Sequence, residues 1–93
     1  MNEQEIIEKL QSEGYDKVYI HNAEPGEIDD EHSHDFDTKL VILKGEIQIK
    51  STTGNFFSNM SYKTGSDTII PRGKPHAAKV GPEGCRYVVA EKH

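Results

Sequence analysis

GEIDDEHSHDFDTKLVILKG, residues 26–45, decides how the rest of the chain is interpreted. This stretch places His32 and His34 on alternate positions, shortly before an apolar segment that runs from Leu40 to Leu43. Successive side chains of a β-strand point to opposite faces, so the two histidines are expected on one face, roughly 7 Å apart along the strand. Two imidazoles at that spacing can converge on one metal ion. A His-X-His pair alone is equally typical of two solvated strand residues, so the remaining sequence has to decide between these interpretations.

The two faces of this predicted strand differ in polarity. The histidine face continues through Phe36, Thr38 and further apolar residues. The opposite face begins with charged residues and becomes apolar at Val41 and Leu43. A barrel strand that faces water should stay polar outside, so this apolar patch needs a cover, either the N-terminal helix or a second subunit. We predict a homodimer on this basis.

Length and composition favour one small folded domain. The 93 residues allow a single, modest core, and the 33% apolar residues come in clusters although the mean hydropathy is only −0.74. Cys85 is the only cysteine, which excludes an internal disulfide and a cysteine-based zinc cluster within one chain. We expect Cys85 to act as a small buried hydrophobic residue in a late strand.

Charge and hydropathy argue against several kinds of partner. The net charge is −5 and no basic stripe is present, which speaks against nucleic acid. The longest uninterrupted apolar run has four residues, Leu40 to Leu43, so neither a membrane span nor a secretory signal is expected. We therefore expect no membrane partner and a cytoplasmic location.

The pattern along the chain predicts one helix followed by short strands. Residues 2–13 have apolar side chains along one side and acids in the first turns, and Gly14 is expected to end the helix. We assign residues 1–14 to a helix that packs on the barrel and residues 15–93 to a single β-barrel domain. His21, on the first predicted strand, is expected at the surface.

Turn residues divide the β domain into strands. Lys44–Gly45 predicts a hairpin between strands at 40–43 and 46–50, residues 51–55 predict another turn, and residues 81–84 predict a turn between strands at 76–80 and 85–90. Seven or eight short strands with one N-terminal helix indicate an all-β sandwich or barrel.

A second histidine segment follows at GSDTIIPRGKPH, residues 65–76. Its glycine, proline, glycine and histidine stand at Gly65, Pro71, Gly73 and His76, and nineteen residues separate it from Gly45. Together with the first segment, this spacing resembles the two sequence motifs of the cupin superfamily. The resemblance covers residues 26–80. It departs from the family pattern at Thr38, where a metal-binding Glu is expected, and at Val80, where an Asn is expected.

The resemblance implies a double-stranded β-helix, also called a jelly roll or cupin barrel, that holds a divalent transition metal through His32, His34 and His76. Iron, zinc, nickel, manganese and copper are the candidate metals, and three imidazoles leave coordination positions open. Thr38 offers at most a hydroxyl in the fourth position. Asp37, one residue away, is the alternative, but only a bulge in the strand would turn it toward the metal.

The family resemblance leaves two classes of function open. The first is a small metal-binding cupin that binds or transforms a small molecule in the barrel, as an oxygenase or an isomerase. Phe36, Arg72 and Lys74 are then candidate substrate-binding residues, the two basic ones as contacts for an anionic substrate. The second is a non-enzymatic module that senses a ligand or a metal or mediates dimerisation, with a metal site weakened by the missing Glu. Whether the chain is an enzyme stays open at this point.

Overall fold

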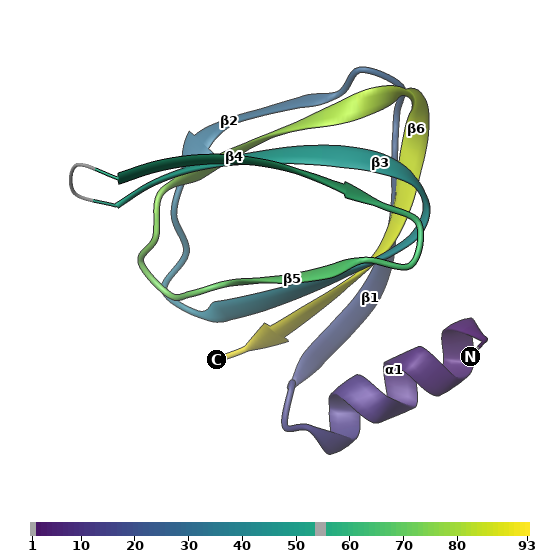
Figure 1. Cartoon of the computed structure of the whole chain (residues 1–93). Helices are drawn as coiled ribbons and strands as arrows, with labels where there is room; N and C mark the ends of the chain where they lie inside the picture. Colours follow the sequence, from purple (N-terminus) through teal and green to yellow (C-terminus); the bar gives the residue numbers. More distant parts are fainter. Residues whose placement is uncertain (1, 54–55) are drawn as a thin grey trace.

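The computed structural model describes residues 2–53 and 56–93, and in these ranges it contains one helix and six strands (Figure 1). Helix α1 spans Glu3–Ser12. The strands are β1 Lys17–Ala23, β2 Ile28–His32, β3 Asp37–Thr53, β4 Phe56–Lys63, β5 Asp67–Ile70 and β6 His76–Lys92. The predicted turn over residues 51–55 falls partly on residues outside the described ranges, and β3 and β4 pair up to Thr53 and Phe56 on either side of it.

Two long strands form the frame of the barrel. Strands β3 and β6 have 17 residues each and run antiparallel to one another along most of their length. The first part of β3 also pairs with β5 and its second part with β4. In the same way, the first part of β6 pairs with β2 and its second part with β1. The result is two facing sheets, β1–β6–β3–β5 and β2–β6–β3–β4, which share the two long strands (Figure 1).

This arrangement is the predicted all-β double-stranded β-helix with one short N-terminal helix. The predicted hairpin at Lys44–Gly45 is wrong, because β3 runs through these residues without reversing. The predicted turn at residues 81–84 is also wrong, because β6 continues through them. Glycine and proline here allow a strand to bend rather than to end.

The bend has a visible cause at Gly45. The pairing between β3 and β6 shifts register on both sides of this residue, which marks bulges in the ladder. Gly45 has a φ of +96°, a conformation that strongly favours glycine. A Cβ atom at Gly45 would overlap the carbonyl oxygen of Gly84 in β6. The two long strands therefore bend together at a point where their backbones approach closely, and this bend turns one sheet over the other.

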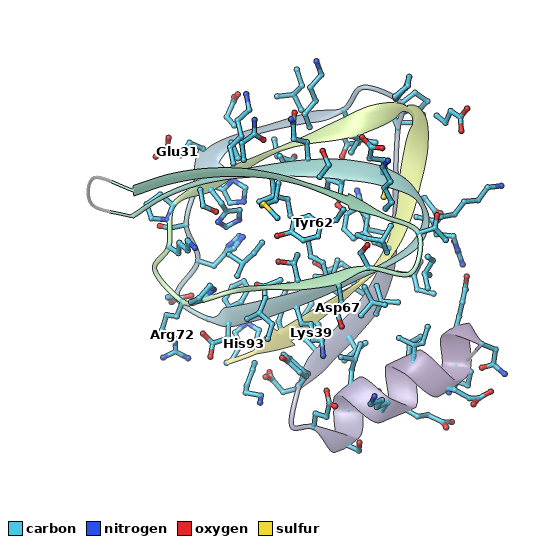
Figure 2. All side chains as sticks on the ribbon, viewed as in Figure 1. Glu31, Lys39, Tyr62, Asp67, Arg72 and His93 are labelled. Atoms are coloured by element: carbon cyan, nitrogen blue, oxygen red, sulfur yellow. The ribbon has the colours of Figure 1, made fainter. Side chains whose placement is uncertain are left out.

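The space between the sheets contains the main hydrophobic core. Its fully buried members include Ile42, Ile47 and Val80, and Tyr62 packs against them (Figure 2). Cys85 belongs to the same cluster and is 4% exposed, which confirms its predicted role as a small buried residue. Burial raises the pKa of its thiol.

Helix α1 covers the outer face of the β1–β6–β3–β5 sheet (Figure 1). The Asn2 side chain caps the helix by accepting a hydrogen bond of 2.8 Å from the Glu5 amide. On the apolar side of the helix, Leu10 is buried in a cluster that includes Val41 and Leu43. The apolar patch that motivated a homodimer is thus covered by the chain's own helix. Among the described residues, no helix is long and apolar enough to cross a membrane.

Candidate metal centre

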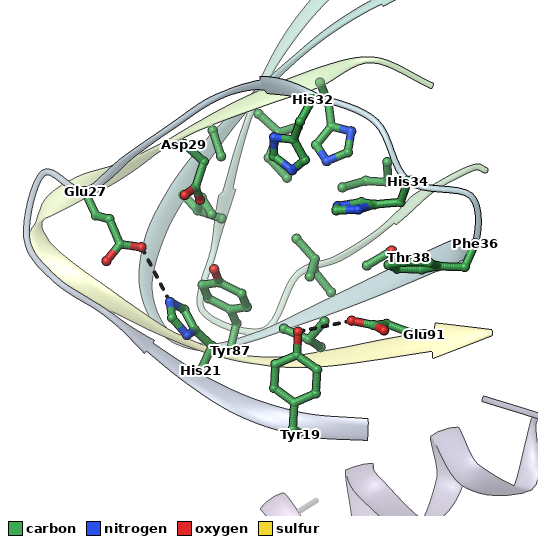
Figure 3. Close-up of a pocket in the computed structure, with 17 residues that line it drawn as sticks. Tyr19, His21, Glu27, Asp29, His32, His34, Phe36, Thr38, Tyr87 and Glu91 are labelled. Carbon is green, nitrogen blue, oxygen red and sulfur yellow. Dashed lines mark hydrogen bonds and ion pairs between the residues drawn. The ribbon is translucent and has the colours of Figure 1, made fainter. Parts of the chain in front are cut away.

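Three histidines from separate segments meet at one side of the barrel interior. His32 is the last residue of β2, His34 lies in the connection to β3, and His76 is the first residue of β6. His32 and His76 are direct partners in the β2–β6 ladder. One potential ligand nitrogen from each ring lies within 4.8 Å of the other two. We call these three residues the histidine wall (Figure 3).

The chain does not form one regular strand from His32 to Leu43, as the sequence suggested. Residues 33–36 interrupt it, and β3 begins at Asp37. Phe36 and Thr38 nevertheless line the same cavity as the histidines. The ring of Phe36 stacks on that of His34, with centroids 4.7 Å apart and an interplanar angle of 21°. Phe36 thus packs against one member of the histidine wall.

Backbone carbonyls orient two of the three imidazoles. The Nδ1 atom of His32 lies 2.6 Å from the carbonyl oxygen of Asp30, and that of His76 lies 2.9 Å from the carbonyl oxygen of Lys74. A carbonyl can only accept, so Nδ1 of each ring carries the proton and donates. The Nε2 atoms then have free lone pairs, which is the tautomer that a metal ligand requires.

The histidine wall runs from solvent to the interior. His32 is exposed, His34 is half-buried and His76 is only 5% exposed. Burial lowers the pKa of His76, and the nearby His32 and His34 lower it further, against the opposing effect of the Lys74 carbonyl. His76 is therefore neutral at pH 7, as metal coordination requires.

The donor set fits a divalent transition metal. Histidine nitrogens bind such ions at about 2.0–2.1 Å, so two of them on one ion lie at most about 4.2 Å apart. The separation here, up to 4.8 Å, is slightly larger. Small ring movements suffice to close it, and the exposed position of His32 permits them.

The histidines border a cavity of about 300 Å³ between the two sheets (Figure 3). Part of its lining is apolar and comes from the core residues Leu40, Ile47, Ile49, Ile70, Ala78 and Val89. The other lining residues are largely polar or aromatic. A cavity of this size suits a small molecule.

A second polar group lies across the cavity from the histidine wall. The Tyr19 hydroxyl donates a hydrogen bond of 3.1 Å to Oε2 of Glu91, and Nε2 of His93 lies 3.4 Å from Oε1. Glu91 is 8% exposed. Thr38 is the direct partner of Glu91 in the β3–β6 ladder, is 7% exposed and also lines the cavity. We call Tyr19, Thr38 and Glu91 the Glu91 wall (Figure 3).

Two further cavity residues were not predicted as part of a site. His21, expected at the surface, lines the cavity, with its Nε2 atom 3.5 Å from Oε2 of Glu27 and its ring 5.3 Å from that of Tyr87. Tyr87 is buried, and burial together with the nearby carboxylates raises the pKa of its phenol. Alternation along β1 and β6 was the available signal, but it required knowing which face of each strand lines the barrel.

Three of the predicted site residues lie elsewhere. Asp37 accepts a hydrogen bond of 2.8 Å from the Arg72 amide through Oδ1, and neither residue lines the cavity. The Arg72 side chain lies outside the barrel (Figure 2). Lys74 contributes its backbone carbonyl to His76 but is also not part of the cavity lining. The carboxylate of Asp37 is thus used to hold the loop before His76.

Comparison with known proteins gives a likeness in fold but not in sequence. No protein-family model and no curated protein matches the chain. Among solved structures, oxalate decarboxylase from Bacillus subtilis superposes with a TM-score of 0.75 and 17% identity over 81% of this chain and 20% of its own. The cupin domain of Drosophila melanogaster CENP-C superposes with a TM-score of 0.74 and 11% identity, over 83% of this chain and 57% of its own.

A CENP-C structure bound to CAL1 gives a similar result, with a TM-score of 0.73 and 13% identity over 81% of this chain and 63% of its own. The chain therefore spans less than two thirds of the length of each of these proteins. At these identities the likeness concerns the fold. The double-stranded β-helix, the two histidine segments and these superpositions together show that the chain has the fold of the cupin superfamily.

Proposed function

We propose that this chain is a small metal-binding cupin in which His32, His34 and His76 hold one divalent transition metal at the edge of the cavity. The observation that carries the proposal is the convergence of three imidazole nitrogens within 4.8 Å. The hydrogen bonds from Nδ1 of His32 and His76 to backbone carbonyls support it, because they leave Nε2 free to coordinate. The similar Bacillus subtilis oxalate decarboxylase has Mn(II) centres, which supports a divalent metal.

Imidazole ligands suit iron, zinc, nickel and copper, and manganese is the metal of the similar decarboxylase. Three protein nitrogens leave coordination positions for water, oxygen or a substrate. A bound metal would act as a Lewis acid or an oxygen-binding centre. The residues of the chain would supply the enclosure, with Phe36 beside His34 and an apolar lining deeper in the cavity. We propose that a small molecule binds there, and oxygenation and isomerisation are the reactions to test.

A non-enzymatic module is the second candidate. One observation favours it, because Thr38 stands where the family motif has a metal-binding Glu and no acid joins the three-histidine cluster among the described residues. The similar CENP-C structure was solved bound to CAL1, which supports protein binding as the alternative for this chain. In this case the metal site would be weak and substrate turnover absent.

Elemental analysis separates these candidates at the first step. Protein purified without chelators should contain close to one transition-metal ion per chain. Protein stripped with a chelator and titrated with zinc, manganese, nickel and iron(II) should take up one equivalent at pH 7.5. Occupancy should fall as pH drops through about 6.5, because protons compete for the imidazoles. Failure to bind any of these ions would reject the metal centre and leave the protein-binding module.

The predicted homodimer requires a separate test. The apolar patch at Val41 and Leu43 gave the motive for it, and Leu10 of helix α1 packs over that patch. A dimer would therefore have to form through another surface. Light scattering at micromolar concentration measures the mass directly, and a value near the 10.5 kDa of one chain would reject the dimer.

A further inference from the structure

The cavity has a one-sided charge. Among the described residues that line it, Glu27, Asp29 and Glu91 are acids, and none is a lysine or an arginine. The basic residues that the sequence suggested for substrate binding, Arg72 and Lys74, are absent from the lining. An anionic group inside the cavity would meet no lysine or arginine among these lining residues. Away from the histidine wall, the negative electrostatic potential from these carboxylates favours the binding of a cation.

Of the three acids in the cavity lining, Glu91 is the most deeply buried. It is 8% exposed, whereas Asp29 is exposed. Tyr19 donates to one of its oxygens and His93 lies beside the other. An ionised carboxylate can accept about four hydrogen bonds, so these two neighbours leave acceptor positions free. Tyr19 as a whole is 39% exposed, but partial desolvation of its phenol and its bond to Glu91 raise the pKa of the phenol, which keeps it a donor.

Thr38 supplies an independent observation. Its Oγ1 atom is buried and has no hydrogen-bond partner. A buried polar group without a partner is unfavourable, and such groups in folded proteins are rare. Thr38 lies directly opposite Glu91 in the β3–β6 ladder, and both line the cavity. Side chains opposite each other on one face have Cβ atoms about 4.5–5.5 Å apart, so one small polar group can contact both.

We propose that the Glu91 wall is a binding subsite for a primary ammonium group, and that the ligand of the cavity is a small amine whose other end reaches the metal. An ammonium group has three donors and no acceptor. It would donate to the free positions of Glu91, and a rotation of the Thr38 side chain would bring its unpartnered Oγ1, which is enclosed in this structure, to the same group. The histidine wall across the cavity would receive the second end of the molecule (Figure 3). Only this second contact rests on the proposed metal function.

The subsite can be tested on metal-free protein, with n-butylammonium chloride as the probe. Butanoate and 1-butanol have the same carbon chain but carry an anion and a neutral hydroxyl. We expect saturable changes in the amide NMR signals of Thr38 and Glu91 with n-butylammonium, and binding at least tenfold weaker for both controls. Equal binding of butanoate or 1-butanol would overturn the subsite.

Substitutions assign the binding to particular atoms. Glu91→Gln removes the charge but keeps the shape and an oxygen that can accept from Tyr19, and it should weaken n-butylammonium at least tenfold. Thr38→Val replaces the unpartnered hydroxyl by a methyl group, so it should weaken the probe while the melting temperature of the ligand-free protein stays equal or rises. The latter variant keeps the test valid if Glu91→Gln folds poorly.

Asp29→Asn is the matched control, because Asp29 is a cavity acid outside the Glu91 wall. It should change n-butylammonium affinity less than twofold. An equal loss in Asp29→Asn and Glu91→Gln would mean that the cavity attracts cations without a defined subsite, and would overturn the proposal.

The failure of this subsite and the failure of the metal centre give different results. If wild-type protein binds n-butylammonium through Glu91 but takes up no zinc, the proposed metal function is wrong and the subsite stands. If zinc binds and n-butylammonium binding does not depend on Glu91, the subsite is wrong and the metal function stands.

Discussion

The two walls of the cavity come from different parts of the fold and differ in how visible they are in the sequence. The histidine wall comes from two short motifs, in which His32 and His34 are two residues apart and His76 follows a glycine- and proline-rich segment. The Glu91 wall comes from three strands, and its hydrogen bond joins residues 72 positions apart. A site built from local motifs can be recognised from spacing. A site built across strands appears only when the pairing is known.

The joint bend of β3 and β6 holds the two walls face to face, and Gly45 is the residue whose change should have the largest effect. Gly45→Ala combines a left-handed backbone conformation, which costs about 1–2 kcal/mol for a residue with a Cβ, with overlap against the Gly84 carbonyl. We expect a loss of more than about 3 kcal/mol of unfolding free energy, a large fraction of a typical 5–15 kcal/mol. Urea denaturation measures it.

Gly65→Ala is the matched control. Gly65 also has a positive φ, +89°, but a Cβ atom there would have no neighbour within 4 Å. Its substitution should lower the free energy of unfolding only by the cost of the left-handed backbone conformation, about 1–2 kcal/mol. If both variants lose the same stability, close packing at the bend does not hold the walls together.

Thr38→Glu places a carboxylate at the position where the family motif has its metal-binding Glu. We expect zinc affinity to rise at least tenfold, equivalent to about 1.4 kcal/mol, because the added charge partly neutralises the ion. The metal-free protein should be less stable, since like charges directly opposite each other destabilise a sheet and Glu91 is the partner of Thr38. Calorimetric titration measures the affinity and thermal unfolding the stability.

Thr38→Gln has nearly the same shape without the charge and should not tighten zinc. Asp37→Asn should leave zinc binding unchanged, because Asp37 caps the Arg72 amide outside the cavity. Weaker zinc binding in Asp37→Asn, together with no gain in Thr38→Glu, would show that Asp37 is the fourth ligand.

The burial of His76 should give a smaller effect, which appears in the metal-free protein as pH changes. Its pKa in the folded state lies below that of an unfolded histidine, about 6.5. The unfolded chain therefore binds the proton first, and stability is full above about pH 6.5 and declines as pH falls below it. Urea midpoints at pH 7.5, 6.5 and 5.5 measure this decline. His76→Gln should flatten the decline, and an unchanged slope would show that His76 is not its source.

The sequence predicted the parts of the fold that depend on local pattern. Helix α1 agrees with the predicted helix within one residue at each end. The residues that cap it and those that form its apolar side lie close together in the sequence, so a local pattern is enough to predict it. The inward position of Thr38 also follows from alternation. The continuity of β3 through residues 44–45 and of β6 through residues 81–84 did not follow, because glycine in a strand is compatible with a turn and with a bulge. Only the pairing of β3 with β6 distinguishes the two.

The candidate site likewise contains residues that a local pattern predicts and residues that only the strand pairing reveals. The convergence of His32, His34 and His76 was expected from the two motifs. Glu91 was missed because it is followed by Lys92 and His93, and an acid among polar residues near the end of a strand usually faces solvent. Its inward position depends on the ladder in which it faces Thr38. Arg72 and Lys74 were misplaced because a basic pair in a loop near a site gives no information about direction.

The most direct test of the three-histidine centre compares two histidines that line the same cavity. His34 belongs to the histidine wall, and His21 lies on β1 beside Glu27. Both are half-buried, so substitution of either by alanine should perturb the fold to a similar degree. Isothermal titration of metal-free protein with zinc at pH 7.5 should give one site per chain in the wild type and in His21→Ala. Affinity should fall at least a hundredfold in His34→Ala. A His34→Ala protein that binds zinc as tightly as the wild type would contradict the proposed metal centre.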